Sequence, residues 1–241
     1  MKLQLSISLA CISFLLMSCK TPSIIVSDSL KSNTSVMEVK GKQGWQFNQV
    51  ITYGAYSTSK IKRSWTKGYT LDFMVRFQTA QQKLNFKQHT SKLNADVFAV
   101  SKFEKAEISL IEGFLEYPLH YENYFAGLIS LENNPNQWEF IIHNPDGGTI
   151  SKDFNCGLAK DKNGNEIVIK GVREIENQAN WIKLDNFGFE FVLNGKAIGA
   201  ISTINSGRVW VSDNLTEELK LVLSSLSTSL LVRHSLEDTN N

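Results

Sequence analysis

The stretch that decides the fold is Leu221-Val-Leu-Ser-Ser-Leu-Ser-Thr-Ser-Leu-Leu-Val232, a run of 12 residues without a charged side chain. Drawn as a helix, the run spreads its apolar side chains around most of the axis, and a helix without a charged face is a buried helix. Its Ser and Thr hydroxyls can bond to carbonyls of the same helix, so their burial is tolerable. We therefore predict a helix over residues 216–233 that is buried in its own domain. A partner-binding helix is the alternative.

Short segments rich in aromatic and β-branched residues precede this helix, and they indicate strands. Apolar and polar side chains alternate between residues 71 and 78, which is the period of a half-buried strand. Asn194-Gly195 separates two apolar runs, and this dipeptide accepts the positive φ angles of a two-residue hairpin. The predicted strands are Gly44–Tyr53, Lys60–Trp65, Tyr69–Gln78, Lys83–His89, Asp96–Phe103, Ala126–Leu131, Trp138–His143, Glu166–Arg173, Trp181–Leu184, Phe187–Leu193, Lys196–Ile204 and Arg208–Val211.

A dozen short strands followed by one uncharged helix suggest a closed sheet around that helix, because closure removes exposed strand edges and surrounds the helix with apolar walls. We predict a mainly β fold, a closed or partly closed antiparallel β-barrel with a buried hydrophobic C-terminal helix. A β-sandwich with the helix packed on one side is the alternative. No repeat or Gly/Pro/Ser-rich linker divides residues 36–236, so we expect a single domain there and a disordered tail over residues 237–241.

The C-terminal part also resembles a known family. Phe189-Glu-Phe-Val-Leu-Asn-Gly-Lys-Ala-Ile-Gly-Ala-Ile201, then Val209-Trp-Val211 and the uncharged helix, are similar to the arrangement in the tubby-like fold, which phospholipid scramblases share. The resemblance covers only the last quarter of the chain. It implies a twelve-stranded barrel around a hydrophobic C-terminal helix. No lipid-headgroup or calcium-binding residue of those families is carried over to this chain.

The first 19 residues have the layout of an export signal, with one cation at Lys2, an apolar run over residues 3–17 and a small residue before Cys19. The run has 15 residues, fewer than the roughly 20 that span a bilayer as a helix. Leu16-Met17-Ser18-Cys19 resembles the lipobox of bacterial lipoproteins, in which a peptidase cuts before a cysteine that carries a diacylglycerol on its sulfur. A generic secretory peptide that contains a cysteine is the alternative.

The lipobox resemblance implies a signal peptide over residues 1–18 and a membrane anchor of acyl chains, such as palmitate, on Cys19. Residues 19–35 are mostly polar with one short apolar patch at Ile24–Val26, a composition typical of a flexible tether. Lys20 stands where an inner-membrane lipoprotein would carry Asp, which by analogy favours the outer membrane, with the protein facing the periplasm. Cys11 is lost with the signal and Cys156 is left without a partner, so the fold has to be stable without a disulfide.

Composition and motifs point to no catalytic chemistry. The chain is 42% hydrophobic and 20% charged with a net charge of +1, an ordinary globular composition that excludes collagen-like and wholly disordered proteins. Its four histidines are scattered and indicate no metal site. Asp161-Lys-Asn-Gly-Asn165 fails as a calcium loop because Glu166 stands where glycine is needed, and we interpret it as a hairpin turn. We expect no metal and no cofactor, and assign no catalytic residue.

Charge is divided unevenly along the chain. Residues 40–95 carry ten cations and one anion, whereas residues 96–241 carry twelve cations and 21 anions. After export we expect no nucleic acid as partner, although basic residues among aromatic ones would favour it in the cytosol. The basic part could contact anionic lipid headgroups or an acidic glycan or protein; mutual neutralisation within the fold is the interpretation we favour. The candidate basic and aromatic surface consists of Lys40, Lys42, Trp45, Lys60, Lys62, Arg63, Trp65 and Lys67.

A second candidate surface lies in Phe114–Phe125, where five aromatic residues surround Pro118. As an exposed loop it could hold an apolar or sugar ligand. As a buried crossing between strands it would belong to the core, and this interpretation is favoured because aromatic runs usually end in cores. The candidate loop residues are Tyr117, Tyr121, Tyr124 and Phe125.

These patterns together predict a lipid-anchored cell-envelope lipoprotein whose β-rich domain is a non-enzymatic binding or structural module at the outer membrane. Its partner would be a protein, a glycan or a lipid headgroup. An envelope hydrolase with a site assembled from separate loops is one alternative. A lipid-interacting, tubby-like barrel is the other.

Overall fold

The structure of the 241-residue chain is a computed structural model. It describes residues 22–42, 48–64, 71–72, 75–77, 80–103, 106–108, 124–132, 134, 136–143, 155–176 and 186–237. Its elements in chain order are α2 (Asp28–Lys31), β1 (Thr34–Glu38), β2 (Thr52–Tyr53), β3 (Tyr56–Thr58), β4 (Lys62–Ser64), β5 (Leu71–Asp72), β6 (Val75–Phe77), β7 (Ala80–His89), β8 (Asn94–Phe103), β9 (Ala106–Ile108), β10 (Tyr124–Leu131), β11 (Gln137–His143), β12 (Asn155–Asp161), β13 (Glu166–Val172), β14 (Gly188–Leu193), β15 (Lys196–Ser202), β16 (Arg208–Ser212) and α3 (Glu217–Glu237).

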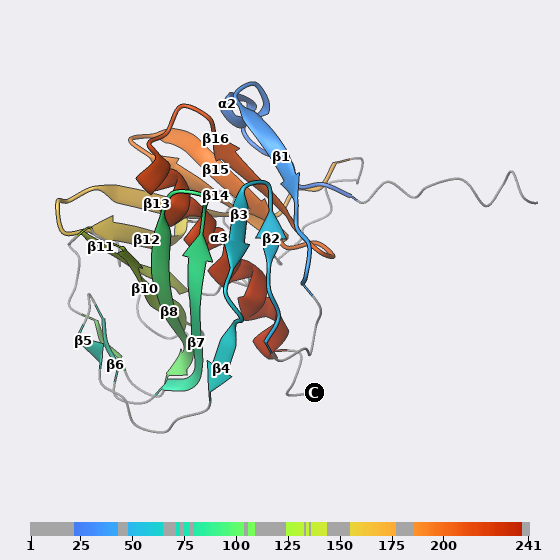
Figure 1. The fold of residues 1–241 in the computed structure, drawn as a ribbon. Helices are drawn as coiled ribbons and strands as arrows, with labels where there is room; N and C mark the ends of the chain where they lie inside the picture. The colour runs from blue at the N-terminus through green and yellow to red at the C-terminus, as the bar shows by residue number, and fades with distance from the viewer. Residues whose placement is uncertain are drawn as a thin grey trace, which may run out of the picture.

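Most of the described strands form one sheet that nearly closes into a barrel (Figure 1). Its order is β1-β16-β15-β14-β13-β12-β11-β10-β8-β7-β3-β2, and β4 pairs with β7 beside this path. The two ends of the sheet meet just beyond β1, where Lys40 and Thr52 exchange two backbone hydrogen bonds of 2.9 and 3.0 Å. The pairing is antiparallel throughout the barrel. The predicted antiparallel barrel is therefore confirmed, while β5, β6 and β9 form a separate small sheet.

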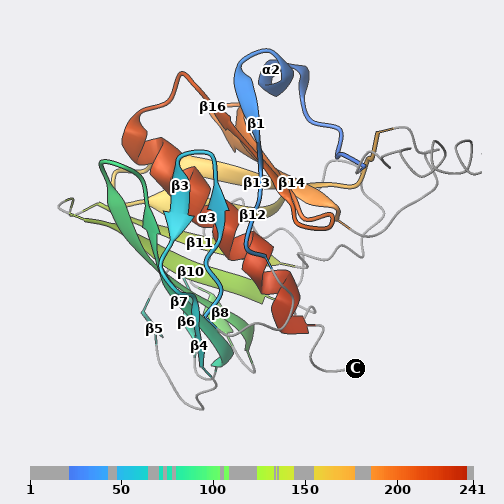
Figure 2. The same ribbon diagram turned by 45° about the vertical axis from the view of Figure 1, so that its right-hand side comes forward.

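Helix α3 runs through the barrel, as Figure 2 shows. Every side chain from Leu221 to Arg233 is buried, and its leucines and valines join one core with inward-facing residues such as Phe140 and Phe191. The prediction that the uncharged run is a buried helix is confirmed. The helix ends at Glu237 rather than at residue 233 as predicted, because the residues after 233 include no glycine or proline that would stop it.

Alternation along β14 shows how the barrel separates its inside from its outside. Phe189 and Phe191 face the core around α3, whereas Glu190 and Val192 face outward. The predicted hairpin to β15 is present, with φ angles of 51° at Asn194 and 75° at Gly195. The outer face of β14, β15 and β16 is therefore partly apolar, and a further element covers it.

Residues 22–33, which we call the N-terminal clasp, cover this outer face. Ile24, Val26 and Leu30 are 1%, 6% and 0% exposed and pack in a second apolar cluster with outward-facing residues that include Trp210. β1 follows directly and pairs with β16. The expectation of a flexible tether over residues 19–35 is wrong for residues 22–35, because three apolar side chains in this polar segment find an apolar surface to bury against.

Candidate functional surfaces

The clasp is fixed to the barrel by backbone hydrogen bonds close to the predicted anchor. Ile24 pairs with Ile175; the Ile25 amide donates to the Glu174 carbonyl at 2.9 Å, and the Glu176 amide donates to the Ser23 carbonyl at 2.8 Å. Figure 2 shows the segment before α2 running down to the segment that follows β13. The chain is therefore held by the fold from Ser23 onward.

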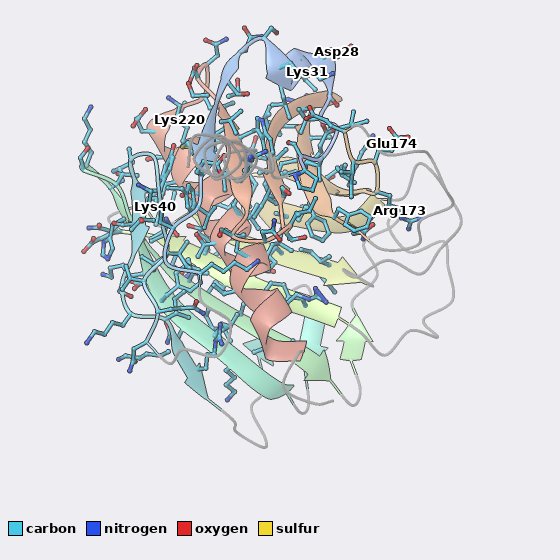
Figure 3. The ribbon with its side chains drawn as sticks, turned by 90° about the vertical axis from the view of Figure 1, so that its right-hand side faces the viewer. Asp28, Lys31, Lys40, Arg173, Glu174 and Lys220 are labelled. Atoms are coloured by element: carbon cyan, nitrogen blue, oxygen red, sulfur yellow. The ribbon has the colours of Figure 1, made fainter. Side chains whose placement is uncertain are left out.

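A buried carboxylate sets the position of the clasp on the barrel. Glu190, on the outward face of β14, is 9% exposed, and its two oxygens accept the Ser27 amide and, at 2.7 Å, the Ser27 hydroxyl. A buried charge is costly unless it is hydrogen-bonded, so Glu190 favours the one clasp position that places Ser27 over it. By contrast, the Asp28–Lys31 ion pair on α2 (Figure 3) is exposed and contributes little.

The candidate basic surface divides into residues used by the fold and residues left outside it. Lys42 donates to the carbonyls of Thr203 at 3.2 Å and Asn205 at 3.0 Å. Arg63 donates to the Val232 carbonyl of α3 at 3.3 Å, and burial lowers the pKa of its guanidinium. The side chains of three lysines are exposed, namely Lys40, Lys60 and Lys62. Trp45, Trp65 and Lys67 lie outside the described residues.

One lysine of the basic part contacts acidic residues from the rest of the chain. Lys87 on β7 lies 3.7 Å from Asp96 and 4.0 Å from Glu132. These contacts fit the interpretation that the two parts of the sequence neutralise each other, but exposed pairs at such distances contribute little stability. Lys40, Lys60 and Lys62 take part in no described ion pair with an acidic side chain, so they keep their charge available at the surface.

The candidate aromatic loop is described only at its end. Phe125 on β10 is 0% exposed, and its ring centroid lies 5.6 Å from that of Phe140 in the core. Phe125 is therefore a core residue, placed inward by the alternation of β10, and its ring is not open to a ligand. Tyr124 is described in its backbone alone, and Tyr117 and Tyr121 lie outside the described residues.

The polar cluster around Asp161 serves the fold. The Asp161 carboxylate accepts bonds from the Asn163 and Asn165 amides and from the side chains of Asn136 and Asn165, at 2.7 to 2.9 Å. This is the hairpin turn between β12 and β13, as predicted. Burial raises the pKa of Asp161, but the four bonds outweigh it and hold the pKa below its ordinary value.

Cys156 is a free, buried cysteine, and burial raises the pKa of its thiol to about 12. Such a thiol is inert rather than nucleophilic. The described residues contain no group of three or more metal-ligating side chains. Within the same part of the chain, no helix combines the length and the apolar character needed to cross a membrane.

Cys19, the predicted anchor, lies outside the described residues. Sequence reasoning missed the clasp, although the apolar patch Ile24–Val26 in a mostly polar segment was a weak signal of it.

Comparison with known protein families, with curated proteins and with solved structures finds no match for this chain.

Proposed function

We propose that this protein is a lipoprotein of the bacterial cell envelope, held at the periplasmic face of the outer membrane by acyl chains on Cys19. The observation that carries the proposal is Leu16-Met17-Ser18-Cys19 at the end of a 15-residue apolar run. Two or three acyl chains give stable anchoring where a single chain is marginal. The clasp is compatible with such an anchor, because the described fold begins at residue 22, three residues after Cys19.

The barrel is proposed to act as a non-enzymatic binding or structural module. Helix α3 occupies the interior of the barrel, with every side chain from Leu221 to Arg233 buried. A partner therefore meets the outer surface rather than a ligand cavity at the barrel axis. The exposed charges of Lys40, Lys60 and Lys62 suit a partner with negative charge, such as a protein or a glycan.

Replacing the anchor residue tests the address. Cys19→Ala should abolish incorporation of labelled palmitate and leave the signal peptide uncleaved, because both steps act on that cysteine. Cys11→Ala is the matched control, since Cys11 lies inside the apolar run and should be dispensable for both steps. Palmitate labelling and the mass of the N-terminal peptide give the answer. A Cys19→Ala protein that still matures and carries label would overturn the proposal.

A further inference from the structure

The distance between the anchor and the folded domain is very short. Four residues lead from Cys19 to Ser23, the first of the described residues with a backbone bond to the barrel. A fully extended chain of that length reaches about 14 Å. If the tether had run to residue 35 as the composition suggested, it would have reached about 50 Å, and the barrel could have turned any face to the membrane.

The chain leaves the clasp at one defined place on the barrel surface. Ser23 is bonded to the segment after β13, where Glu174 and Glu176 are exposed. Ile25, the next residue but one, is 38% exposed and is one of the few large apolar side chains on the described surface. Figure 3 shows Arg173 and Glu174 on one side of the barrel and Lys40 on the other. We call the exposed residues Ile25, Glu174 and Glu176, which lie next to the buried Ser23, the anchor-side surface.

We infer that the anchor-side surface faces the lipid bilayer. The clasp then holds the barrel against the membrane in one orientation, and the exposed lysines Lys40, Lys60 and Lys62 point away from the membrane. The inference rests on the proposed lipid anchor at Cys19. Its structural basis is the pairing of Ser23–Ile25 with residues 174–176, which keeps Cys19 within about 14 Å of this surface. The sheet order supports the position of the lysines. β4 pairs with β7, and four strands separate β7 from β13 in the sheet.

The cause of this orientation is the covalent tether and not charge. Glu174 and Glu176 are exposed anions on the anchor-side surface, and only Ile25 there is suited to the apolar edge of the headgroup layer. An anionic lipid surface attracts basic side chains and would repel these two. Proximity of the anchor-side surface to lipid should therefore persist at high salt, which screens an attraction that depends on lysines.

Single cysteines on the acylated protein give a test with little background. The sulfur of Cys19 is consumed by the diacylglycerol, and Cys156 is buried with a thiol pKa of about 12, so neither accepts a fluorophore in the folded state. The variants are Glu176→Cys on the anchor-side surface, Lys60→Cys on the far side, and Lys162→Cys in the turn at the opposite end of β13; all three positions are exposed. Each protein is reconstituted in vesicles of phosphatidylethanolamine and phosphatidylglycerol that contain a headgroup-attached nitroxide quencher.

We expect quenching at position 176 to exceed that at positions 60 and 162 several-fold, at low and at high salt alike. A Gly/Ser linker of 20 residues inserted between Thr21 and Pro22 has a root-mean-square reach of about 25 Å and should remove most of this difference. Equal quenching at the three positions in a protein that carries palmitate would overturn the inference and leave the lipid anchor standing. Absence of acylation in the parent protein would overturn both.

Discussion

Replacing Tyr53 by Phe tests how α3 is held in the barrel, because the change removes one hydroxyl group and keeps the ring. That hydroxyl is buried where β2 meets the helix: it donates to the Ser224 carbonyl at 2.7 Å and lies 2.9 Å from the Thr228 hydroxyl. Thr228 in turn donates to the side-chain oxygen of Gln88 on β7 at 2.9 Å. Tyr53 therefore belongs to a chain of polar contacts that joins the helix to two strands of the wall.

The expected loss is about 1–2 kcal/mol of unfolding free energy, because a hydroxyl donates one bond and a neutral bond contributes about 1 kcal/mol net. Neither partner is orphaned by the change. The Ser224 carbonyl lies within the helix, where it also accepts an amide four residues further on, and Thr228 keeps its bond to Gln88. The additional penalty of an unpaired buried group, about 1–3 kcal/mol, is therefore avoided.

Urea unfolding followed by tryptophan fluorescence measures this difference, since Trp138 and Trp210 are both buried. Tyr56→Phe is the matched control: its ring centroid lies 5.6 Å from that of Tyr53, but Tyr56 is only half-buried. The control should change stability by less than about 0.5 kcal/mol. The reasoning fails if Tyr53→Phe costs no more than the control, or if it costs more than about 3 kcal/mol, the range of an orphaned group.

Two further substitutions and one labelling experiment test other parts of the structure. Asp161→Asn should lower the free energy of unfolding by about 1–3 kcal/mol at neutral pH. Because the pKa of Asp161 in the folded protein lies below its ordinary value, the stabilisation by the carboxylate is present above a pH of about 4 and is lost as the pH falls through the folded pKa. Urea unfolding of the parent protein and the variant should therefore converge in acid. Leu30→Ala leaves a cavity between α2 and the barrel, because Leu30 is fully buried there, and it should cost about 2–4 kcal/mol of unfolding free energy. Faster tryptic cleavage after Lys31, with the barrel still folded, would show that the loss is confined to the clasp. Cys156 should resist iodoacetamide at pH 8 until urea unfolds the protein, as mass spectrometry would show, and rapid reaction in the folded state would contradict its burial.

The C-terminal part of the fold was predictable because its signals are local. Asn194-Gly195 requires positive φ angles that few other dipeptides accept, and the apolar runs on either side supply the register of β14 and β15. The enclosure of α3 followed from the absence of any charge between Leu221 and Val232. Each of these features can be recognised within a window of a few residues, without knowledge of what packs against it.

β12 shows why other parts could not be predicted. Its inward positions include Gly157 and Ala159, which are small because neighbouring strands come close: a Cβ atom at Gly157 would lie 2.7 Å from the Ile141 carbonyl oxygen. A strand that lacks β-branched and aromatic residues has no local signature. β1 was not predictable for a related reason. Its Val36 is 53% exposed, and the position of the strand is determined by pairing with β16 rather than by its own side chains.

The clasp depends on partners that are distant in the sequence. Ser27 and Glu190 are separated by 163 residues, and an outward-facing glutamate on a strand is ordinarily solvated. Only the folded barrel places the apolar outer face of β14 to β16 beside a segment whose composition is otherwise that of a tether. The point at which the predicted tether ends, on which the inferred orientation of the barrel rests, could therefore not be predicted from composition.

The same limit applies to charge, and it decides where a partner can bind. The basic residues in the first third of the domain differ in what they do. Lys42 and Arg63 donate hydrogen bonds to backbone carbonyls of the barrel and of α3, so replacing them would disturb the fold as well as any contact with a partner. Lys40, Lys60 and Lys62 keep exposed ammonium groups. If the anchor-side surface faces the lipid, these three lysines point into the periplasm. A negatively charged partner that reaches them has to approach from that side, and its binding should weaken with salt while the position of the barrel on the membrane does not change.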